Sequence, residues 1–299
     1  MAANHGRLVL VDAFAGPGRY VGGEAGSPLI LLDAYLSHDY RDRIKSELVY
    51  LFIEERIDRV EHLRMEVANL NLPSNVKVQI EHGRYEETFR RTLDAIHQKG
   101  EQLAPTFSFV DPFGYSDAPM DLTGEFLQFR RTEVLVYLPL PFIARFVGLP
   151  GQERALNSLF GTDAWRSAIE MAGDERRTFL HDLFRDQLQL RGSRWVRSFE
   201  IQSGQGNGYH LFFGTSNELG LAKMKEAMWK ADPVTGQRFT DSTQSDQLVL
   251  FDQGVDTAPL LLALRERFKG SPFTIEQADH FTLIDALHPG AHSPPDPGP

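Results

Sequence analysis

Cysteine is absent from the chain, which excludes disulfide bonds, cysteine nucleophiles and metal centres held by thiolates. The sequence also contains no apolar run long enough to span a bilayer, and its start has no basic segment followed by an apolar one. From these absences we expect a cytoplasmic protein that has no contact with a membrane.

Positive charge is scarce, because 31 lysine and arginine residues face 41 aspartate and glutamate residues and leave a formal net charge of −10. Nucleic-acid affinity depends largely on neutralising phosphates, so this charge disfavours nucleic acid as a partner without excluding a local basic surface. Six arginines are candidates for such a surface: Arg176, Arg177, Arg185, Arg191, Arg194 and Arg197. An ordinary solvated face explains the same residues equally well.

Several motifs of common enzymes are missing. The histidines form no His-Glu-x-x-His pair and no other pair at metal-ligand spacing, so we expect no metal site. There is no Gly-x-Ser-x-Gly elbow of a serine hydrolase and no Gly-Lys-Ser/Thr phosphate loop. What remains is a chain of 299 residues, 41% hydrophobic, which is enough for a sizeable core.

Short apolar segments alternate with helical patterns over the first 140 residues. The expected strands cover about residues 8–13, 48–53, 76–80, 106–110 and 134–138. Helical spacing of apolar residues is found between them, for example over residues 28–39 and 57–71. This alternation predicts an α/β fold with a doubly wound parallel sheet and right-handed crossovers.

The second half of the chain departs from this alternation. Residues 142–192 predict a helical insertion, and two strands over 195–201 and 209–214 flank a glycine-rich segment typical of a hairpin. A helix is expected over 217–230, and a polar loop over 234–247. We place the end of the first domain, residues 1–232, after this helix.

A smaller unit is expected over residues 245–288. Two helical patterns separated by a short turn predict either a helix-turn-helix or an ordinary packed helix pair. Thr274 and Gln277 have the spacing of a capping box at the start of the second helix. The proline- and glycine-rich tail over 289–299 is typical of a disordered segment.

A glycine turn directly follows the first expected strand. Residues 12–20 read Asp-Ala-Phe-Ala-Gly-Pro-Gly-Arg-Tyr. Gly16 and Gly18 carry no Cβ, so the backbone there can approach a ligand closely at the carboxyl end of a strand. The third glycine of the dinucleotide fingerprint is missing, since position 21 is Val21. A tight turn without a ligand is the alternative interpretation.

Acidic residues end three of the expected strands. Asp12 ends the first, Glu54 with its neighbour Glu55 ends the second, and Asp111 ends the fourth. An acid after the second strand is well placed to accept hydrogen bonds from the hydroxyls of a ribose, although a surface role is the alternative.

The segment Asp111-Pro112-Phe113-Gly114 combines a carboxylate with a rigid turn. Asp111 can accept a hydrogen bond from a substrate N–H or O–H group, and Phe113 or Tyr115 can stack on a flat group. A plain turn, with the aspartate bonded to its own backbone, is the alternative.

Taken together, these features resemble the class I methyltransferase fold. The phrases at residues 12–20, Gly-Ser-Pro-Leu at 26–29 and Phe-Val-Asp-Pro-Phe-Gly at 109–114 are similar to the three-Cys-motif partner family. So are Phe-Phe-Gly-Thr at 212–215 and Met-Lys-Glu-Ala-Met-Trp-Lys at 224–230. The resemblance spans about residues 8–285. It implies a methyltransferase that uses S-adenosylmethionine, a small winged-helix-like end, and a partner protein that carries a three-Cys motif.

The resemblance also implies roles for residues at matching positions. The implied cofactor-binding residues are Asp12, Phe14, Ala15, Gly16, Gly18, Glu54, Glu55 and Asp111. The implied catalytic residues are Asp111, Pro112, Phe113 and Gly114, which stand where amino-methyltransferases have an Asn/Asp-Pro-Pro-Tyr/Phe motif. Asp111 is expected to orient or deprotonate the methyl acceptor.

The chain departs from the pattern at three places. The first strand begins so early that we expect no helix ahead of it, and one side of the cofactor site is then open. Arg84 stands where an acid near the adenine is expected, and Glu86 or Glu87 is the candidate replacement. Phe113 replaces the second proline of the amino-methyltransferase motif, which leaves the acceptor atom undetermined.

Methyl transfer from S-adenosylmethionine to an unknown acceptor is therefore the leading functional hypothesis. A non-catalytic binding module is the second, in which the C-terminal helical unit contacts nucleic acid or a partner protein. A nicotinamide oxidoreductase is the third, and the missing third glycine argues against it.

Overall fold

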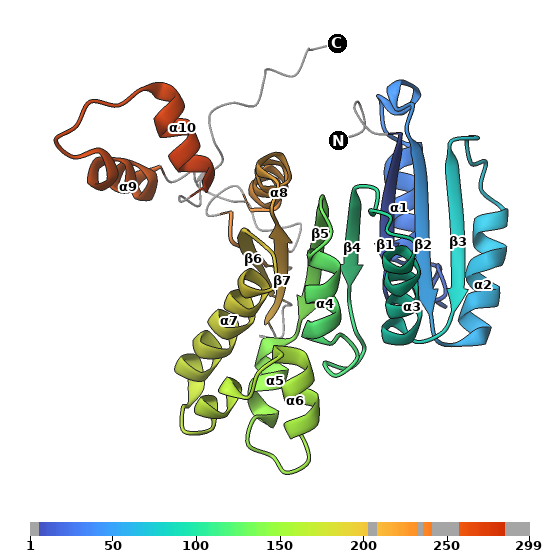
Figure 1. Ribbon diagram of the computed structural model, residues 1–299, viewed down its shortest axis with the longest axis horizontal. Coiled ribbons are helices and arrows are strands. Elements are labelled where there is room, and N and C mark those ends of the chain that lie inside the picture. Colours follow the sequence, from blue (N-terminus) through green and yellow to red (C-terminus); the bar gives the residue numbers. More distant parts are fainter. Residues whose placement is uncertain (1–5, 203–207, 233–235, 241–256, 285–299) are drawn as a thin grey trace.

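The computed structural model describes residues 6–202, 208–232, 236–240 and 257–284. Its centre is an eight-stranded sheet in the order β3-β2-β1-β4-β5-β7-β6-β8 (Figure 1). The strands are β1 (Arg7–Asp12), β2 (Glu47–Glu54), β3 (Val76–His82), β4 (Thr106–Val110), β5 (Thr132–Leu138), β6 (Trp195–Gln202), β7 (Gly208–Thr215) and β8 (Arg238–Thr240). In the described part of the sheet, β7 alone runs antiparallel to its neighbours.

This strand order confirms the doubly wound α/β fold, with β1 and β4 at the point where the order reverses. An open sheet of this order, with a reversed seventh strand, is the Rossmann-like methyltransferase arrangement that the resemblance implied. Ligands of such sheets bind outside the carboxyl ends of the strands at the reversal point. The fold therefore directs attention to the loops that follow β1, β2 and β4.

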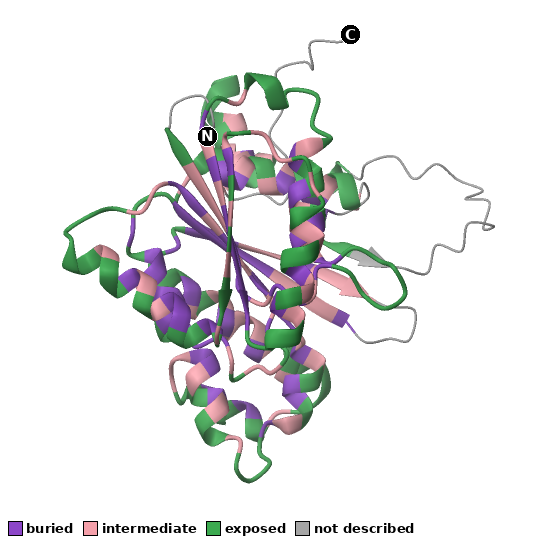
Figure 2. Ribbon diagram, turned by 90° about the vertical axis from the view of Figure 1, so that its right-hand side faces the viewer, coloured by how far each residue is buried: buried purple, intermediate pink, exposed green. Residues whose placement is uncertain are grey.

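Helices cover both faces of the sheet. They are α1 (Ser27–Leu36), α2 (Ile57–Ala68), α3 (Tyr85–Gln98), α4 (Met120–Leu127), α5 (Leu140–Phe146), α6 (Glu153–Phe160), α7 (Gly173–Leu190), α8 (Glu218–Ala231), α9 (Ala258–Phe268) and α10 (Ile275–Ile284), with short 3-10 turns at Arg41–Arg43 and Ala164–Ile169. Successive strand residues point to opposite faces: Val11 packs with the cluster from α3 to α7, and Leu10 packs with α1 and α2. Helix α8 covers the sheet near β6 and β7. Figure 2 shows buried residues concentrated along the strands and the inner helix faces.

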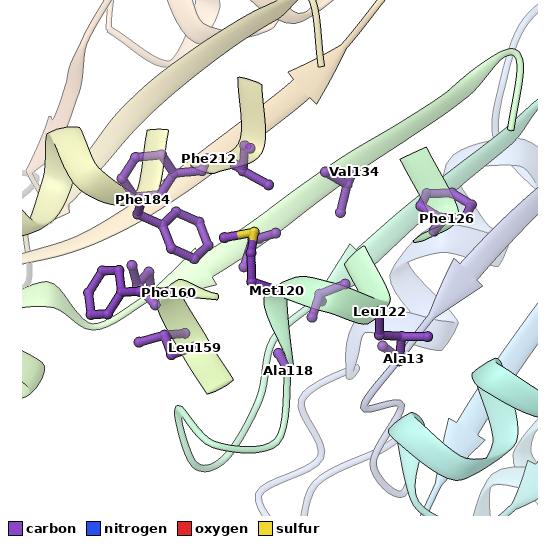
Figure 3. Packing of buried hydrophobic residues seen from close by; sticks show 14 of the residues in the cluster. Ala13, Ala118, Met120, Leu122, Phe126, Val134, Leu159, Phe160, Phe184 and Phe212 are labelled. Atoms are coloured by element: carbon purple, nitrogen blue, oxygen red, sulfur yellow. The ribbon is translucent and has the colours of Figure 1, made fainter. Parts of the chain in front are cut away.

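The largest cluster of buried side chains includes a helix that the sequence patterns do not predict. In Figure 3, Met120, Leu122 and Phe126 of α4 lie within this cluster, together with Val134 of β5. Six of the eight residues of α4 are buried, so the helix lacks the polar face that reveals an amphipathic helix in a sequence. Gly124 lets α4 pack closely, since a Cβ there would lie 3.0 Å from the Arg191 side chain.

The expected hairpin of β6 and β7 is confirmed, because the two strands pair antiparallel from Trp195–Thr215 to Gln202–Gly208. Its turn, residues 203–207, lies outside the described residues. The expectation of a polar loop over 234–247 is wrong at β8, which pairs parallel with β6. Arg238 of β8 binds the Glu200 carboxylate at 2.8 Å. This cross-strand ion pair and the backbone pairing explain a strand that lacks an apolar pattern.

The C-terminal region contributes α9 and α10 to the described residues. The capping box at the start of α10 is confirmed: Thr274 N donates to Gln277 Oε1 at 2.9 Å, and Gln277 N donates to Thr274 Oγ1 at 3.2 Å. Buried Lys225 of α8 donates to the carbonyl oxygens of Thr282 at 2.6 Å and Leu283 at 3.1 Å. The winged-helix character and the division into two domains stay predictions. The expected tail over 289–299 lies outside the described residues.

The arginines considered as a basic surface make contacts with different parts of the chain. Arg191 pairs with Asp121 at 2.7 Å, and the guanidinium of Arg194 lies over the ring of Trp195 at 4.4 Å. Arg197 donates to the carbonyl oxygen of Ile284. Arg176 and Arg177 are different, because both line a cavity. Within the described residues, no helix is long and apolar enough to cross a membrane.

Candidate functional site

The glycine turn after β1 continues across the carboxyl edge of the sheet. Ala13 N donates to the carbonyl oxygen of Phe109, and Ala15 N donates to that of Ile53, both at 2.9 Å. These bonds hold the chain between the ends of β4 and β2 for three residues beyond β1. The turn at Gly16 therefore begins directly above the point where the strand order reverses.

The two glycines of the turn serve different purposes. Gly16 has φ +66°, and a Cβ at this position would meet nothing within 4 Å, so its outer side is open. Gly18 has φ +80°, and a Cβ there would lie 2.7 Å from Leu63 Cδ1 in the core beneath α2. Gly18 is thus required for packing the turn onto α2, whereas only Gly16 has space for an approaching ligand.

Glu54 fixes the turn to the end of β2. Its side chain is only 3% exposed. Oε2 accepts a hydrogen bond from Gly16 N at 2.9 Å, and Oε1 accepts one from Arg56 N at 2.8 Å. Each carboxylate oxygen has a second lone pair, so both can accept a further hydrogen bond from a ligand.

A cavity of about 240 Å³ opens beside this carboxylate. It is lined by Ala13, Phe14, Ile53, Glu54, Glu55, Arg56, Arg59, Gly83, Arg84, Tyr85, Glu86, Phe113 and Asp117. The ring of Phe14 lies 5.4 Å from that of Tyr85, so aromatic side chains form one wall. Phe113 is 75% exposed, and the guanidinium of Arg59 lies 5.1 Å from its ring. The cavity therefore combines flat apolar surfaces with a buried acceptor.

Charged side chains surround the entrance of this cavity. Arg84 lies between two acids, 3.7 Å from the Glu55 carboxylate and 4.0 Å from that of Asp117. Of the two candidate replacements for the missing acid near the adenine, Glu86 lines the cavity and Glu87 is not among its lining residues. Glu86 also pairs with Arg90 at 3.4 Å.

Asp12 is a buried carboxylate with one oxygen unused. The side chain is 0% exposed. Oδ1 accepts a hydrogen bond from Phe14 N at 3.2 Å, whereas Oδ2 has no hydrogen-bond partner. Burial raises the pKa of Asp12 to about 6, and the hydroxyl of Ser27 opposes this rise in pKa only in part. An unpartnered buried oxygen at a strand end is a place for a positively charged or hydrogen-bond-donating ligand group.

Asp111 stands at the same edge, after β4. Burial raises its pKa to about 6, and its negative charge contributes to the raised pKa of Asp12. It also contributes to raising the pKa of Tyr137 of β5, whose ring stacks on that of Tyr209 at 5.2 Å. Asp111 is not among the residues that line the 240 Å³ cavity. Its electrostatic neighbours lie on both sides of β4, Asp12 on β1 and Tyr137 on β5.

The raised pKa of Asp12 predicts a pH-dependent stability. The folded-state pKa of about 6 exceeds the ordinary aspartate pKa of 3.8, so the buried acid favours folding when protonated and opposes it when ionised. The corresponding stability is present below about pH 4 and is lost as the pH rises through 6. We expect Asp12→Asn to raise the free energy of unfolding by about 2–3 kcal/mol at pH 8 and by much less at pH 4.

Urea unfolding of both proteins at the two pH values tests this prediction. Asp111 contributes a second pH-dependent part to the wild type, so the variant should retain some pH dependence. If the stability of both proteins changed equally with pH, burial would not destabilise the ionised form of Asp12.

The structure brings together some of the predicted site residues and separates others. Four of them line the 240 Å³ cavity: Phe14, Glu54, Glu55 and Phe113. Phe113 thus lies with the implied cofactor-binding residues rather than with Asp111. Ala15 and Pro112 are buried, and Gly114 lies close to the Asp117 side chain. The other seven predicted site residues do not line this cavity: Asp12, Ala15, Gly16, Gly18, Asp111, Pro112 and Gly114.

Sequence reasoning missed further residues of the cavity wall. Arg59, Gly83, Tyr85 and Asp117 come from α2, the end of β3, α3 and the loop after β4. Only the position of the His82-Gly83-Arg84-Tyr85 segment after a strand could have indicated part of this wall. Within the described residues, no group of three or more His, Asp or Glu side chains could hold a metal ion.

The sequence matches no protein-family model and no curated protein. Among solved structures, the chain is similar to Trm1 from Pyrococcus horikoshii in complex with S-adenosyl-L-methionine, with a TM-score of 0.38 and 14% identity, covering 69% of this chain and 49% of that one. The METTL16 MTase domain has a TM-score of 0.38 and 14% identity, covering 72% and 62%. An O-methyltransferase from Bacillus cereus in complex with SAH has a TM-score of 0.36 and 13% identity, covering 70% and 74%.

The chain thus spans about half of the Trm1 chain and less than two thirds of the METTL16 domain. Identities and TM-scores this low do not bear on activity or substrate. The fold assignment rests on the strand order of the sheet itself.

Proposed function

We propose that this protein is a methyltransferase that binds S-adenosylmethionine at the carboxyl edge of β1, β2 and β4. The observation that carries the proposal is the Glu54 carboxylate, which holds Gly16 N–H at 2.9 Å and at the same time lines the 240 Å³ cavity. One side chain thereby couples the glycine turn to a concave site at the reversal point of the sheet.

The residues at this edge fit such a cofactor. The buried carboxylate of Asp12 suits the ammonium group of the methionine part, because a nearby positive charge stabilises the ionised form that burial disfavours. The open side of Gly16 admits a ligand close to the backbone. The remaining lone pairs of Glu54 suit ribose hydroxyls, and Phe14 and Phe113 offer flat surfaces for a purine.

When bound, S-adenosylmethionine supplies a methyl group on a sulfonium that is a good leaving group. The protein then has to hold the acceptor in line and prepare its attacking atom. With a pKa of about 6, Asp111 is ionised at neutral pH and accepts a hydrogen bond or a proton from an acceptor N–H or O–H group. Pro112 and Gly114 fix the turn that positions this carboxylate.

Calorimetric titration with S-adenosylhomocysteine tests the cofactor assignment. We expect the wild type to bind and Gly16→Ala to bind at least tenfold more weakly, because the new methyl group fills the open side of the turn. Gly23→Ala is the matched control: Gly23 also has a positive φ, +94°, and open space around its Cβ, but it lies on the loop outside the site. Both variants carry about 1–2 kcal/mol of left-handed backbone strain.

If both variants lost the same affinity for S-adenosylhomocysteine, the cause would be backbone strain and not the filled space at Gly16. No binding by the wild type would remove the cofactor assignment altogether.

The proposal includes a partner protein and a cellular location. The partner protein carrying a three-Cys motif rests on the sequence resemblance alone. A cytoplasmic location rests on the absence of cysteine and of an apolar segment long enough for a membrane.

A further inference from the structure

A second and larger cavity, of about 700 Å³, lies on the other half of the carboxyl edge. It is lined by Pro141, Ala144, Arg145, Gly173, Asp174, Arg176, Arg177, Thr178, His181, Glu200, Gln202, Gly208, His210 and Arg238. None of these residues lines the 240 Å³ cavity. Four arginines and two acids surround the space, so it is cationic in a chain whose net charge is −10.

Two of the four arginines are neutralised by ion pairs. Arg177 pairs with Asp174, and Arg238 pairs with Glu200 at 2.8 Å. These two pairs use both acids of the cavity wall. The charge of the cavity therefore depends on Arg145 and Arg176.

The charges of Arg145 and Arg176 have no acidic partner among the described residues. Arg176 donates only to carbonyl oxygens, including Ala168 at 2.9 Å and Ala144 at 3.0 Å, and these bonds fix its position without neutralising it. Arg145 is exposed on α5 and has no ion pair with a described residue. Both arginines line the same cavity.

Two imidazoles complete the polar wall. His181 of α7 lies 2.8 Å from Ser198 Oγ through Nε2, and its ring is 5.4 Å from that of His210 on β7. Burial lowers the pKa of His210 to about 4, so this ring is neutral at physiological pH. Its Nδ1 is buried and has no hydrogen-bond partner within the described residues.

We propose that this cavity binds a phosphate group of the methyl acceptor, which makes the acceptor a nucleotide or a nucleic acid. Guanidinium groups match the geometry of phosphate oxygens and bind them through charge-assisted hydrogen bonds. A phosphate offers several acceptor oxygens to two arginines and an imidazole, whereas a carboxylate has two oxygens and is satisfied by one guanidinium. The volume also exceeds what an isolated anion needs and lies within the range of small-molecule sites.

The position of the cavity is consistent with an acceptor that reaches Asp111. Because β7 runs antiparallel, its first residues Gly208 and His210 lie at the carboxyl edge, where His210 pairs with Leu138 at the end of β5. The strand β5 lies between β4 and β7, so the cavity is about two strand spacings, or about 10 Å, from the end of β4. One nucleotide can span that distance.

Phosphate binding by the cavity does not depend on the proposed methyl transfer, but its role as an acceptor site rests on that proposal. The test is calorimetric titration of the whole protein, saturated with S-adenosylhomocysteine, with uridine 5′-monophosphate and with a single-stranded oligouridylate. A uracil base avoids competition for a site that suits adenosine. Uridine and oligoglutamate serve as ligands without phosphate.

We expect binding of the uridine phosphates, weakened about tenfold by Arg145→Gln, since a charge-assisted hydrogen bond is lost. Arg154→Gln is the matched control, because Arg154 is exposed on the neighbouring α6 and does not line the cavity. It should bind as the wild type does. Tighter binding of the oligouridylate, falling steeply with salt, would identify nucleic acid as the source of the phosphate. Equal affinities would identify a free nucleotide.

Two kinds of result would overturn the proposal. The first is that neither phosphate probe binds, or that uridine or oligoglutamate binds as tightly as the uridine phosphates do. The second is that Arg154→Gln weakens binding of the uridine phosphates as much as Arg145→Gln does. Binding of S-adenosylhomocysteine, measured separately, distinguishes the two proposals. If it binds while the phosphate probes do not, the phosphate site fails and the methyltransferase proposal stands. If only the uridine phosphates bind, the methyltransferase proposal fails, and the cavity stands as a phosphate-binding site without the role of an acceptor site.

Discussion

Replacing Glu54 with alanine is expected to abolish measurable binding of S-adenosylhomocysteine and to destabilise the protein. The carboxylate accepts hydrogen bonds from Gly16 N and Arg56 N, so its removal leaves two backbone N–H groups without their acceptor. The loss of two such partners corresponds to about 2–4 kcal/mol of the free energy of unfolding. Because the same change releases the glycine turn and removes the ribose acceptor, we expect the affinity to fall more than about a hundredfold.

The adjacent acid provides the control for this experiment. Glu55 also lines the cavity, but its side chain is exposed and its ion pair with Arg84 is long, at 3.7 Å. We expect Glu55→Ala to change stability by less than about 0.5 kcal/mol, because surface ion pairs contribute little. Urea unfolding and calorimetric titration measure the two effects separately.

The comparison also decides which acid holds the ribose. If Glu55→Ala greatly weakened binding of S-adenosylhomocysteine at unchanged stability, Glu55 would be the residue that binds the ribose. The role of Glu54 would then be limited to its hydrogen bonds within the glycine turn. Undiminished binding by Glu54→Ala would show that neither the turn nor this carboxylate belongs to a cofactor site.

Asp111→Ala is expected to reduce methyl transfer by about 10²–10⁴-fold, the usual contribution of a positioned general base. Binding of S-adenosylhomocysteine should stay within about threefold, because the proposal assigns Asp111 to the methyl acceptor and not to the cofactor. Transfer is measured as label moved from S-adenosylmethionine with a tritiated methyl group into nucleotide, nucleic-acid and protein fractions of a cell extract.

Asp117→Ala is the matched control for this measurement. Asp117 lies on the same loop, where it accepts a hydrogen bond from Ser116 Oγ at 3.2 Å and lies 4.0 Å from Arg84; it lines the 240 Å³ cavity, so its own binding of S-adenosylhomocysteine is measured beside its transfer activity. Full transfer by Asp111→Ala would remove the aspartate from the mechanism. A parallel loss of affinity for S-adenosylhomocysteine would instead place Asp111 among the residues that hold the cofactor.

The positions of the strands were predictable from their short runs of β-forming residues. β2 is an apolar run, and β4, in which buried and half-buried residues alternate, occupies the predicted residues 106–110. Parallel strands place their following residues at one edge, which is why Asp12, Glu54 and Asp111 could be grouped from the sequence. The pKa of Asp12 responds to both other carboxylates, which agrees with that grouping.

The remaining features depend on contacts between segments far apart in the chain. Gly16 and Gly18 look equivalent in the sequence, and only the packing of Leu63 under the turn distinguishes them. The arginine-lined cavity draws its walls from α5, α7, β6, β7 and β8. No local pattern indicates that Arg145 and Arg176 lack acidic partners, because this depends on which acids the fold brings near them.

The contact between α8 and α10 has a consequence for how the chain can be divided. Lys225 is buried, and the last carbonyl groups of α10 accept its hydrogen bonds. The negative end of a helix dipole is a favourable neighbour for such a cation. A fragment that ends before α9 would therefore lose the acceptors of a charge buried between α8 and α10. The predicted boundary after residue 232 separates α8 from α10 in the sequence, although the two helices are in contact. We therefore expect a fragment that ends at residue 232 to be less stable than one that includes α9 and α10.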